Sequence, residues 1–197
     1  MLKNAILRHL ALRKDQNRSK ILYGTLIFIV WCLFSAGAPV FAFDGKGAAK
    51  GINPLDKNGQ MRVSPGDRCP VCGMKVIRYP KFSSAIQLHS NATYYFCSTG
   101  CMIRSWMHPE IYLGCKTADL KQPIVKEYFT GRHTDARNVI FVFGSDVIGP
   151  MGPALVPVMN AHFLQTFKRR HGGKTEFLLQ ALDDARWLEI TGKRPGN

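Results

Sequence analysis

The hydrophobic pattern begins with a long apolar run close to the start of the chain. Residues 21–38 contain no charged side chain, and residues 1–20 before them carry a net charge of +5. A basic flank followed by an apolar run is typical of an export signal or a membrane anchor. Small residues at positions 40 and 42 would allow cleavage after Ala42. The run is also just long enough to stay as an anchor, and a buried helix of a cytosolic protein is the remaining alternative.

This pattern predicts the location of each part of the chain. Residues 1–20 would be a cytoplasmic flank and residues 21–42 a signal peptide or membrane anchor. Residues 43–66 are rich in Gly, Lys, Asn and Pro, which favours a linker. The rest would face the periplasm from the cytoplasmic membrane, held through residues 21–38, or would be periplasmic after cleavage near Ala42.

The next part of the chain predicts a hairpin followed by a helix. Residues 83–89 alternate in polarity, Ser90-Asn91 marks a turn, and residues 93–96 are rich in β-formers. Ser98 is a suitable cap for a helix that begins near Thr99 and ends before Pro109.

The second half repeats this plan of strand, turn, strand and helix. The predicted elements are strands over 138–144 and 153–158 with a Gly-Pro-Met-Gly-Pro turn between them, a helix over 161–170, a short strand over 175–178 and a last helix over about 181–190. We therefore predict an α+β fold of two related β-β-α(-β) units. Residues 67–135 would form a Cys-rich metal-binding unit and residues 136–197 the second unit.

The net charge of +14 suggests nucleic-acid binding until its distribution is considered. The part after Ala42 keeps +9, but these charges are spread over the chain. No basic run has interleaved aromatic residues, and no zinc-finger His pair is present. We therefore expect no nucleic-acid partner, and a basic exported surface would meet anionic lipid headgroups or an acidic protein.

Four of the six cysteines form two close pairs. Cys69 and Cys72 precede Gly73-Met74, and after 24 intervening residues Cys97 and Cys101 follow. A C-x2-C pair and a C-x3-C pair at this spacing can place four thiolates on one ion, because the predicted hairpin brings its two ends together. Gly73 and Gly100 would supply tight backbone turns.

Three interpretations of these cysteines remain open. They could form disulfides in an oxidising compartment, hold a structural Zn²⁺, or form a functional site for a soft metal. Methionine favours the third, because thioethers suit Cu(I) better than Zn²⁺. Met102 and Met107 fit a helix core, whereas Met151 lies in a Pro/Gly turn. The candidate metal ligands are Cys69, Cys72, Met74, Cys97, Cys101 and Met151, with Cu(I) as the expected ion and Zn²⁺ as the alternative.

Two other roles are alternatives for the cysteines. Cys69-Cys72 could be a thiol-disulfide redox pair, but such pairs sit at a helix N-terminus, and residues 75–77 here are β-formers. A zinc-stabilised adaptor that only binds a protein partner is the other alternative. Cys32 lies within the apolar run, and Cys115 is expected to be a spare thiol.

These motifs together resemble the NosL family. The resemblance rests on Cys-x-x-Cys-Gly-Met at residues 69–74, the Cys-Met start of the helix at residue 101, and Gly-Pro-Met-Gly at residues 149–152. The segment 96–101 is also similar to the TRASH/YHS type of metal-trafficking motif. Typical NosL proteins are lipoproteins with an acylated cysteine, which this chain lacks, and many carry acidic residues where this chain has Cys97 to Cys101.

The resemblance implies a fold and a function. NosL proteins are exported copper-binding accessory proteins of nitrous oxide reductase assembly, with two related β-β-α units. The implied role is that of a Cu(I) metallochaperone, not an enzyme, which delivers copper outside the cytoplasmic membrane to a multicopper enzyme or an assembly factor.

Overall fold

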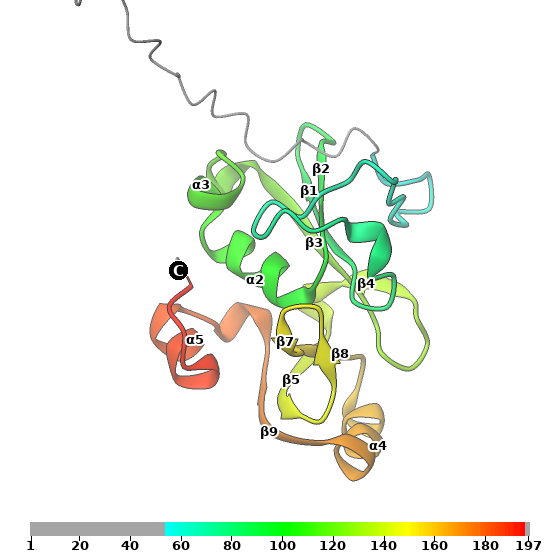
Figure 1. Ribbon diagram of the computed structural model, residues 1–197, viewed down its shortest axis with the longest axis vertical. Coiled ribbons are helices and arrows are strands. Elements are labelled where there is room, and N and C mark those ends of the chain that lie inside the picture. The colour runs from blue at the N-terminus through cyan, green and yellow to red at the C-terminus, as the bar shows by residue number, and fades with distance from the viewer. Residues whose placement is uncertain (1–53, 196–197) are drawn as a thin grey trace, which may run out of the picture. The chain divides into compact units, whose positions relative to one another are not determined.

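The computed structural model describes residues 54–195, which carry two larger antiparallel β-sheets, a two-stranded hairpin, and helices packed on the sheets (Figure 1). The predicted cytoplasmic flank, apolar segment and cleavage site lie outside these described residues, as do residues 43–53 of the predicted linker. Within residues 54–195, no helix has the length and apolar character needed to cross a membrane.

The first sheet has the strand order β2-β1-β3-β4. Its strands are β1 (Ser84–Leu88), β2 (Thr93–Phe96), β3 (Leu120–Lys126) and β4 (His133–Asp135). All five residues of β1 are buried. Since successive side chains of a strand point to opposite faces, both faces of the sheet must be covered at β1. The hairpin of β1 and β2 was predicted from the alternating pattern, and it is confirmed.

Helix α2 (Thr99–Met107) covers part of this sheet and is followed by the short helix α3 (Pro109–Tyr112). The Ser98 side chain accepts a hydrogen bond from the Cys101 N–H at 3.2 Å, so the predicted cap is confirmed. Met102 and Ile103 are fully buried in the core. Pro109 begins α3, because proline fits the first position of a helix.

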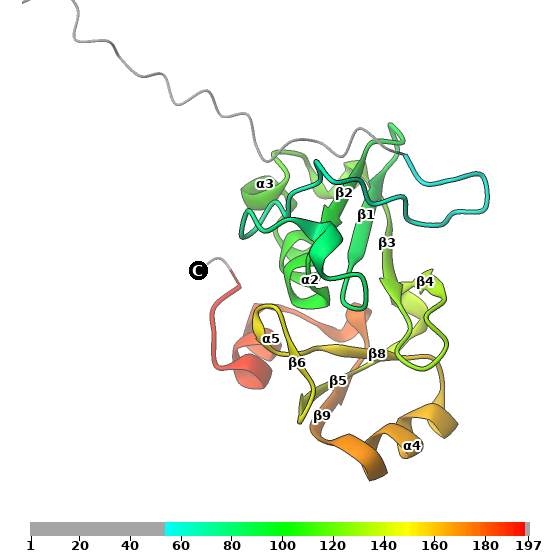
Figure 2. The same cartoon turned by 45° about the vertical axis from the view of Figure 1, so that its right-hand side comes forward.

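The second sheet has the order β8-β5-β9. Its strands are β5 (Ile140–Ser145), β8 (Val156–Val158) and β9 (Gly172–Phe177); between the first two lies a small hairpin of β6 (Ile148–Gly149) and β7 (Gly152–Pro153). Helix α4 (Ala161–His171) packs on this sheet, and α5 (Asp184–Thr191) follows β9 (Figure 2).

The two sheets share one connection pattern. In each sheet, one inner strand (β1 or β5) comes first along the chain. The next strand (β2 or β8) pairs with one side of it, and the strand that comes after a helix (β3 or β9) pairs with its other side. The runs are β1-β2-α2-β3 and β5-β8-α4-β9. The predicted α+β fold is therefore confirmed for the described residues, and each half contains the predicted β-β-α order, followed in both halves by a further strand.

The two runs nevertheless share a core. Phe141 and Phe143 on β5 pack with the main core cluster, which contains Ile86, Phe96 and Met102, whereas Val142 between them faces a smaller cluster under α4. This alternation follows from the two faces of a strand. Strand β5 is therefore covered on one side by the first run and on the other by α4.

Residues 54–66 were predicted to belong to a linker, but they contact the first sheet. Met61 and Val63 pack against the main core cluster. The Met61 N–H donates to His133 Nδ1 at 3.1 Å, and the Arg62 N–H donates to the Tyr95 hydroxyl at 3.2 Å. This part of the predicted linker therefore belongs to the folded unit.

Strands β3 and β4 were not predicted. Pro123 lies inside β3 and cannot donate a ladder hydrogen bond, so the segment does not look like an inner strand. The structure accommodates it because β4 pairs only from Ile124 onward. The last helix also starts later than predicted, since Asp183 caps it and accepts from the Arg186 N–H.

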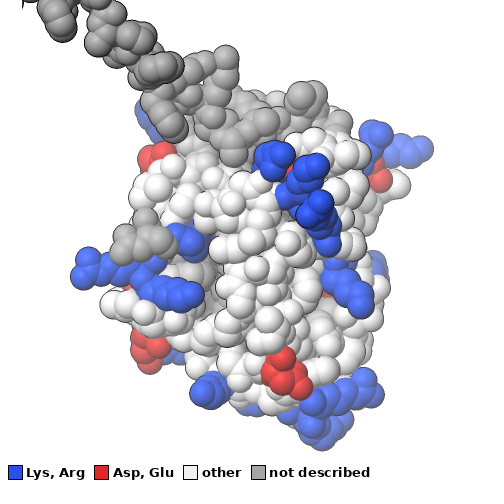
Figure 3. Space-filling model, viewed as in Figure 1, with Lys and Arg blue, Asp and Glu red and all other residues white. Residues whose placement is uncertain are grey.

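On the face drawn in Figure 3, Lys and Arg side chains lie in several separate groups, with Asp and Glu beside some of them. The positive charge on this face is thus divided, as the sequence distribution predicted.

Candidate metal centre

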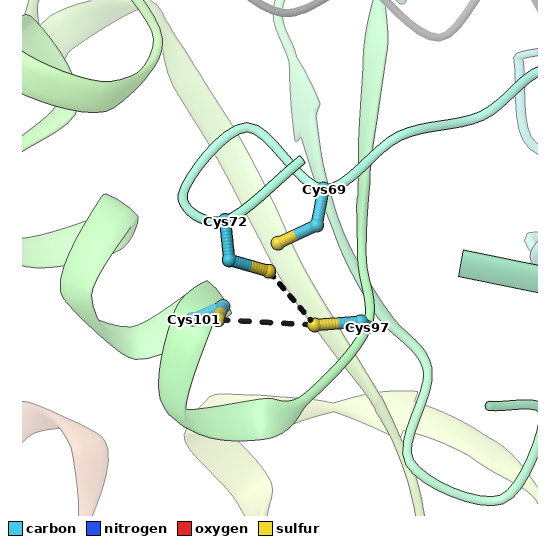
Figure 4. A group of neighbouring side chains, drawn as sticks. All are labelled: Cys69, Cys72, Cys97 and Cys101. Carbon is cyan, nitrogen blue, oxygen red and sulfur yellow. Dashed lines mark hydrogen bonds between the residues drawn. The ribbon is translucent and has the colours of Figure 1, made fainter. Parts of the chain in front are cut away.

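The four paired cysteines meet at one point beside the first sheet. Their sulfur atoms all lie within 4.8 Å of one another. The Sγ atoms of Cys72 and Cys97 are 3.4 Å apart, and those of Cys97 and Cys101 are 4.0 Å apart. Figure 4 shows all four side chains pointing into a common space. The hairpin therefore brings the two cysteine pairs together, as we predicted from the sequence.

A tight turn over residues 69–74, the knuckle, positions the Cys69–Cys72 pair. The Gly73 N–H donates to the Cys69 carbonyl at 2.8 Å, and the Cys69 N–H donates to the Met74 carbonyl at 2.9 Å. Gly73 has φ +73°, the left-handed region that glycine adopts without a Cβ penalty. The backbone amides of Val71 and Met74 also donate to the sulfurs of Cys69 and Cys72. The predicted turn at Gly73 is confirmed, and it points both sulfurs inward.

The junction of β2 and α2 positions the second pair. Cys97 directly follows the last residue of β2, and Cys101 lies in the first turn of α2. The capping bond from Cys101 N–H to Ser98 Oγ fixes the start of that turn. Gly100 is an ordinary helical residue, so the prediction of a tight turn there is wrong; an added Cβ would make normal contact with Leu155 at 3.6 Å. The helix start, not a glycine turn, sets the spacing of this pair.

The four thiols of the cluster differ in pKa, because they contact one another and are buried to different extents. Hydrogen bonds from the thiols of Cys101 and Cys97 lower the pKa of Cys69 well below its ordinary value. Contacts with Cys101 and Cys69 raise the pKa of Cys97, and the contact with Cys69 raises the pKa of Cys101. Burial raises the pKa of Cys72. Contacts among the four sulfurs thus favour one thiolate in the cluster and oppose further ionisation.

The spacing of the sulfurs suits a single ion. A tetrahedral ion with metal–sulfur bonds of about 2.3 Å holds its sulfurs about 3.8 Å apart, which falls within the 4.8 Å limit of this cluster. Thiolates are soft ligands that favour Zn²⁺ or Cu(I). Because metal binding requires thiolates, it would also release the protons that the sulfurs now share. The donor set therefore fits a soft metal ion.

The two candidate methionines lie in different surroundings. Met74 is half-buried and packs against the main core cluster. Met151 lies in the turn between β6 and β7 and is 44% exposed. It lines a pocket whose wall also includes Cys101. The four cysteines are thus the candidate ligands that the structure brings into one cluster, and Met151 lies across a pocket from their helix.

The remaining cysteine of the described segment lies apart from this cluster. Cys115 follows α3 and is half-buried. The four clustered cysteines form no disulfide in this structure. Cys69-Cys72 does not open an α-helix, because the Gly73 turn and the 3-10 helix Val76–Arg78 follow it. This differs from the helix N-terminus at which thiol-disulfide enzymes place their reactive pair.

The fold and the cluster define an α+β protein with a compact four-thiol site. The family model of NosL matches residues 60–181. The chain therefore belongs to the NosL family, as the motifs predicted.

Known proteins of this family resemble the chain over most of its length. The copper-binding lipoprotein NosL of Stutzerimonas stutzeri is 25% identical over 133 residues, which cover 66% of this chain and 69% of that protein. The crystal structure of the copper chaperone NosL from Shewanella denitrificans superposes with a TM-score of 0.55 at 20% identity. This match covers 68% of the chain and 99% of the crystallised one. At this identity, the likeness shows a shared fold.

Proposed function

We propose that this chain is a metallochaperone that carries copper as Cu(I) in the cluster of Cys69, Cys72, Cys97 and Cys101. The observation that carries the proposal is the meeting of four free thiols within 4.8 Å in a member of the NosL family. Soft sulfur ligands favour Cu(I). The names of its relatives, a copper-binding lipoprotein and a copper chaperone, support copper as the metal.

Copper transfer requires that an acceptor can reach the ion. Cys69 and Cys97 are fully buried and Cys101 nearly so, whereas Cys72 is only half-buried. Cu(I) is stable with fewer than four sulfur ligands, so Cys72 can leave while an incoming ligand binds. The exposed Met151 thioether is the proposed auxiliary ligand during this exchange, and Met74 is the candidate on the knuckle side.

The proposed acceptor is a multicopper enzyme, such as nitrous oxide reductase, or an assembly factor for it. The chain would perform no catalysis, and it would act outside the cytoplasmic membrane. Residues 21–38 would tether it to the membrane, or cleavage near Ala42 would release it into the periplasm. The lipoprotein character in the name of its relative supports a place near a membrane.

The direct test is an anaerobic Cu(I) titration of the reduced chain against a coloured Cu(I) chelator. We expect one tightly bound Cu(I), and Cys72→Ser should weaken its binding by more than the roughly 10–100-fold that loss of an outer-shell partner costs. Cys115→Ser is the matched control, because Cys115 lies outside the cluster. Equal Cu(I) binding by Cys72→Ser and the parent chain would refute the proposed site.

Burial of three of the four sulfurs favours a second candidate, a structural Zn²⁺ site that stabilises an adaptor domain. A parallel titration with Zn²⁺ separates the two functions. If Zn²⁺ resists displacement by Cu(I) and its chelation unfolds the chain, the structural role is correct. Copper carriage predicts that Cu(I) displaces Zn²⁺ and that the metal-free chain stays folded.

A thiol-disulfide oxidoreductase that uses Cys69-Cys72 is the third candidate. It predicts rapid exchange with a small disulfide in the absence of metal, and this exchange should disappear in Cys69→Ser. Copper carriage predicts that bound Cu(I) blocks such exchange, because the ion occupies the thiolates.

A further inference from the structure

The segment that carries the four clustered cysteines contains no acidic residue. Between Asp67 and Glu110 the chain has no Asp or Glu, although it has several basic side chains. Asp67 itself is buried, and its carboxylate accepts the Ser64 N–H at 2.6 Å. The exposed basic residues of this segment are Arg68, Lys75, Arg78 and Lys81. The part of the chain that forms the cluster therefore presents positive charge to solvent.

Two of these cations flank the knuckle. Arg68 and Lys75 lie opposite each other in an isolated antiparallel bridge at its two ends. The Arg68 Nη1 donates to the Gly73 carbonyl at 3.1 Å, so the guanidinium is held against the knuckle. Gly73 directly follows Cys72, the least buried of the four cysteines. A positive charge is therefore held beside the most accessible cysteine of the cluster.

These charges are available to a partner. Among the residues that the structure describes, Arg68, Lys75 and Arg78 take part in no ion pair. A guanidinium has several N–H donors in one plane, and the Gly73 carbonyl uses only one edge of Arg68. The other edge can bind a carboxylate through two parallel hydrogen bonds. Lys75 adds a second positive charge at the other end of the knuckle.

From this arrangement we infer that the knuckle is the docking surface for a copper-accepting protein with acidic side chains around its own copper ligands. The inference rests on the proposed function, because it names the partner of the same site. An acceptor ligand must come within about 2.3 Å of the ion, so the acceptor must contact the surface around Cys72. Carboxylates beside that ligand would pair with Arg68 and Lys75. Exposed pairs of this kind act mainly on the rate of encounter.

An anionic membrane surface is the alternative partner for this positive charge. It fits the knuckle less well, because a membrane that covered Arg68 and Lys75 would also cover Cys72, through which copper is proposed to leave. An acidic protein creates no such conflict, since it brings its carboxylates and its copper ligands to the same surface.

The test measures the rate at which Cu(I) moves from the reduced, copper-loaded full chain to a peptide in excess. Two blocked peptides share a Cys-Gly-Gly-Cys core, which is flanked by glutamates in one and by lysines in the other. A fluorophore on each peptide is quenched when Cu(I) binds. We expect the acidic peptide to receive copper severalfold faster at low salt. This advantage should disappear near 1 M salt, where the Debye length is about 3 Å.

Charge reversal separates docking from the intrinsic reactivity of each peptide. The double variant Arg68→Glu with Lys75→Glu should invert the preference, so that the basic peptide gains and the acidic peptide loses rate. The matched control is Arg170→Glu with Lys174→Glu, which reverses the same two charges at exposed positions on α4 and β9. It should keep the preference of the parent chain. An unchanged preference in the first variant, or an equal change in the second, would overturn the inference.

The Cu(I) titration of each chain separates this inference from the proposed function. If the parent chain binds no Cu(I), the proposed function fails before any transfer is measured. If it binds Cu(I) but supplies both peptides equally at low salt, only the docking inference fails. Lys75→Glu alone covers the case in which loss of the bond from Arg68 to Gly73 disturbs the knuckle. It should reduce the preference for the acidic peptide while the chain still binds Cu(I).

Lipid vesicles test the membrane alternative. Transfer to the acidic peptide is measured with vesicles of phosphatidylglycerol and with vesicles of phosphatidylcholine. We expect the anionic vesicles to affect the parent chain and the variant Arg68→Glu with Lys75→Glu alike. If anionic vesicles slowed transfer from the parent chain only, the surface would belong to a membrane contact and the inference would be wrong.

Discussion

His133 joins the start of the folded unit to the edge of the first sheet. Its Nδ1 accepts the Met61 N–H at 3.1 Å, which requires an unprotonated nitrogen. Burial, and then the nearby charge of Lys126, lower the pKa of His133 from its ordinary value of 6.5. The folded state therefore favours the neutral ring more strongly than the unfolded state does.

This shift predicts a pH dependence of stability. Because the pKa in the folded state lies below the unfolded value, the stabilisation is complete above the unfolded value of about 6.5 and is lost as the pH falls through the folded pKa. We expect the free energy of unfolding, measured with urea, to fall between about pH 7.5 and about pH 5.

His133→Phe is the control for this titration, because phenylalanine cannot bind a proton. The relevant quantity is the difference in slope between the two chains, because every other ionisable group is the same in both. Equal slopes of unfolding free energy against pH would contradict the assignment to His133.

At the residue scale, the cysteines of the site could be predicted but the surroundings of Met151 could not. The Cys69–Cys72 and Cys97–Cys101 spacings are local, and one hairpin is enough to bring them together. Met151 lines the same pocket as Cys101 only because β6–β7 packs near the start of α2, which depends on the whole second run. No local pattern in the sequence contains that information. The binding roles of Met74 and Met151 stay predictions.

Among the elements, α2 and α4 offer a matched comparison. Each starts after a strand with a polar cap: Ser98 accepts from the Cys101 N–H, and Asn160 accepts from the Phe163 N–H at 2.9 Å. Replacing such a cap with alanine costs about 1 kcal/mol. For the site, the relevant difference is that only the cap of α2 holds a proposed metal ligand, Cys101, in place.

We therefore predict that Ser98→Ala and Asn160→Ala lower the free energy of unfolding by similar amounts, about 1 kcal/mol each. Only Ser98→Ala should also weaken Cu(I) binding, because it loosens the turn that carries Cys101. Chemical denaturation and the Cu(I) titration measure the two effects separately. If Asn160→Ala weakened Cu(I) binding as much, the link between the cap and the site would be wrong.

The elements that could be predicted are those with a local signal in the sequence. The hairpin β1–β2 and the starts of α2 and α4 could be predicted, because alternation and caps are local. Strand β3 could not be predicted, because a proline such as Pro123 is not expected in an inner strand. The strand is compatible with Pro123 because its neighbour β4 pairs only with residues 124–126. Pairing between distant segments supplied what the local pattern lacked.

For the whole molecule, the shared core bears on the predicted division into residues 67–135 and 136–197. Phe141 on β5, Phe177 on β9 and Trp187 on α5 belong to the same buried cluster as the residues of the first sheet. Phe141 is fully buried, and its ring stacks on Phe177 at 5.4 Å between centroids. Removing the second run would expose the part of the first that packs against these rings.

We predict that residues 54–135 alone do not unfold cooperatively, whereas residues 54–197 show one cooperative transition. The fragment loses the aromatic residues of the second run that complete its core. Thermal unfolding followed by circular dichroism measures the difference. A cooperative transition of the fragment near the temperature of the longer chain would show instead that the first run is an independent domain.

The cysteine cluster also has a consequence for the order in which the chain is made. All four thiols lie between Cys69 and Cys101, while the sheet beside them needs β3, Leu120–Lys126, for completion. A chain that emerges from its N-terminus therefore presents a complete set of sulfur ligands before its central strand β1 has both neighbours. Short loops close at low entropic cost. An ion captured at that moment would hold the hairpin and the start of α2 together while the rest of the protein is still being synthesised.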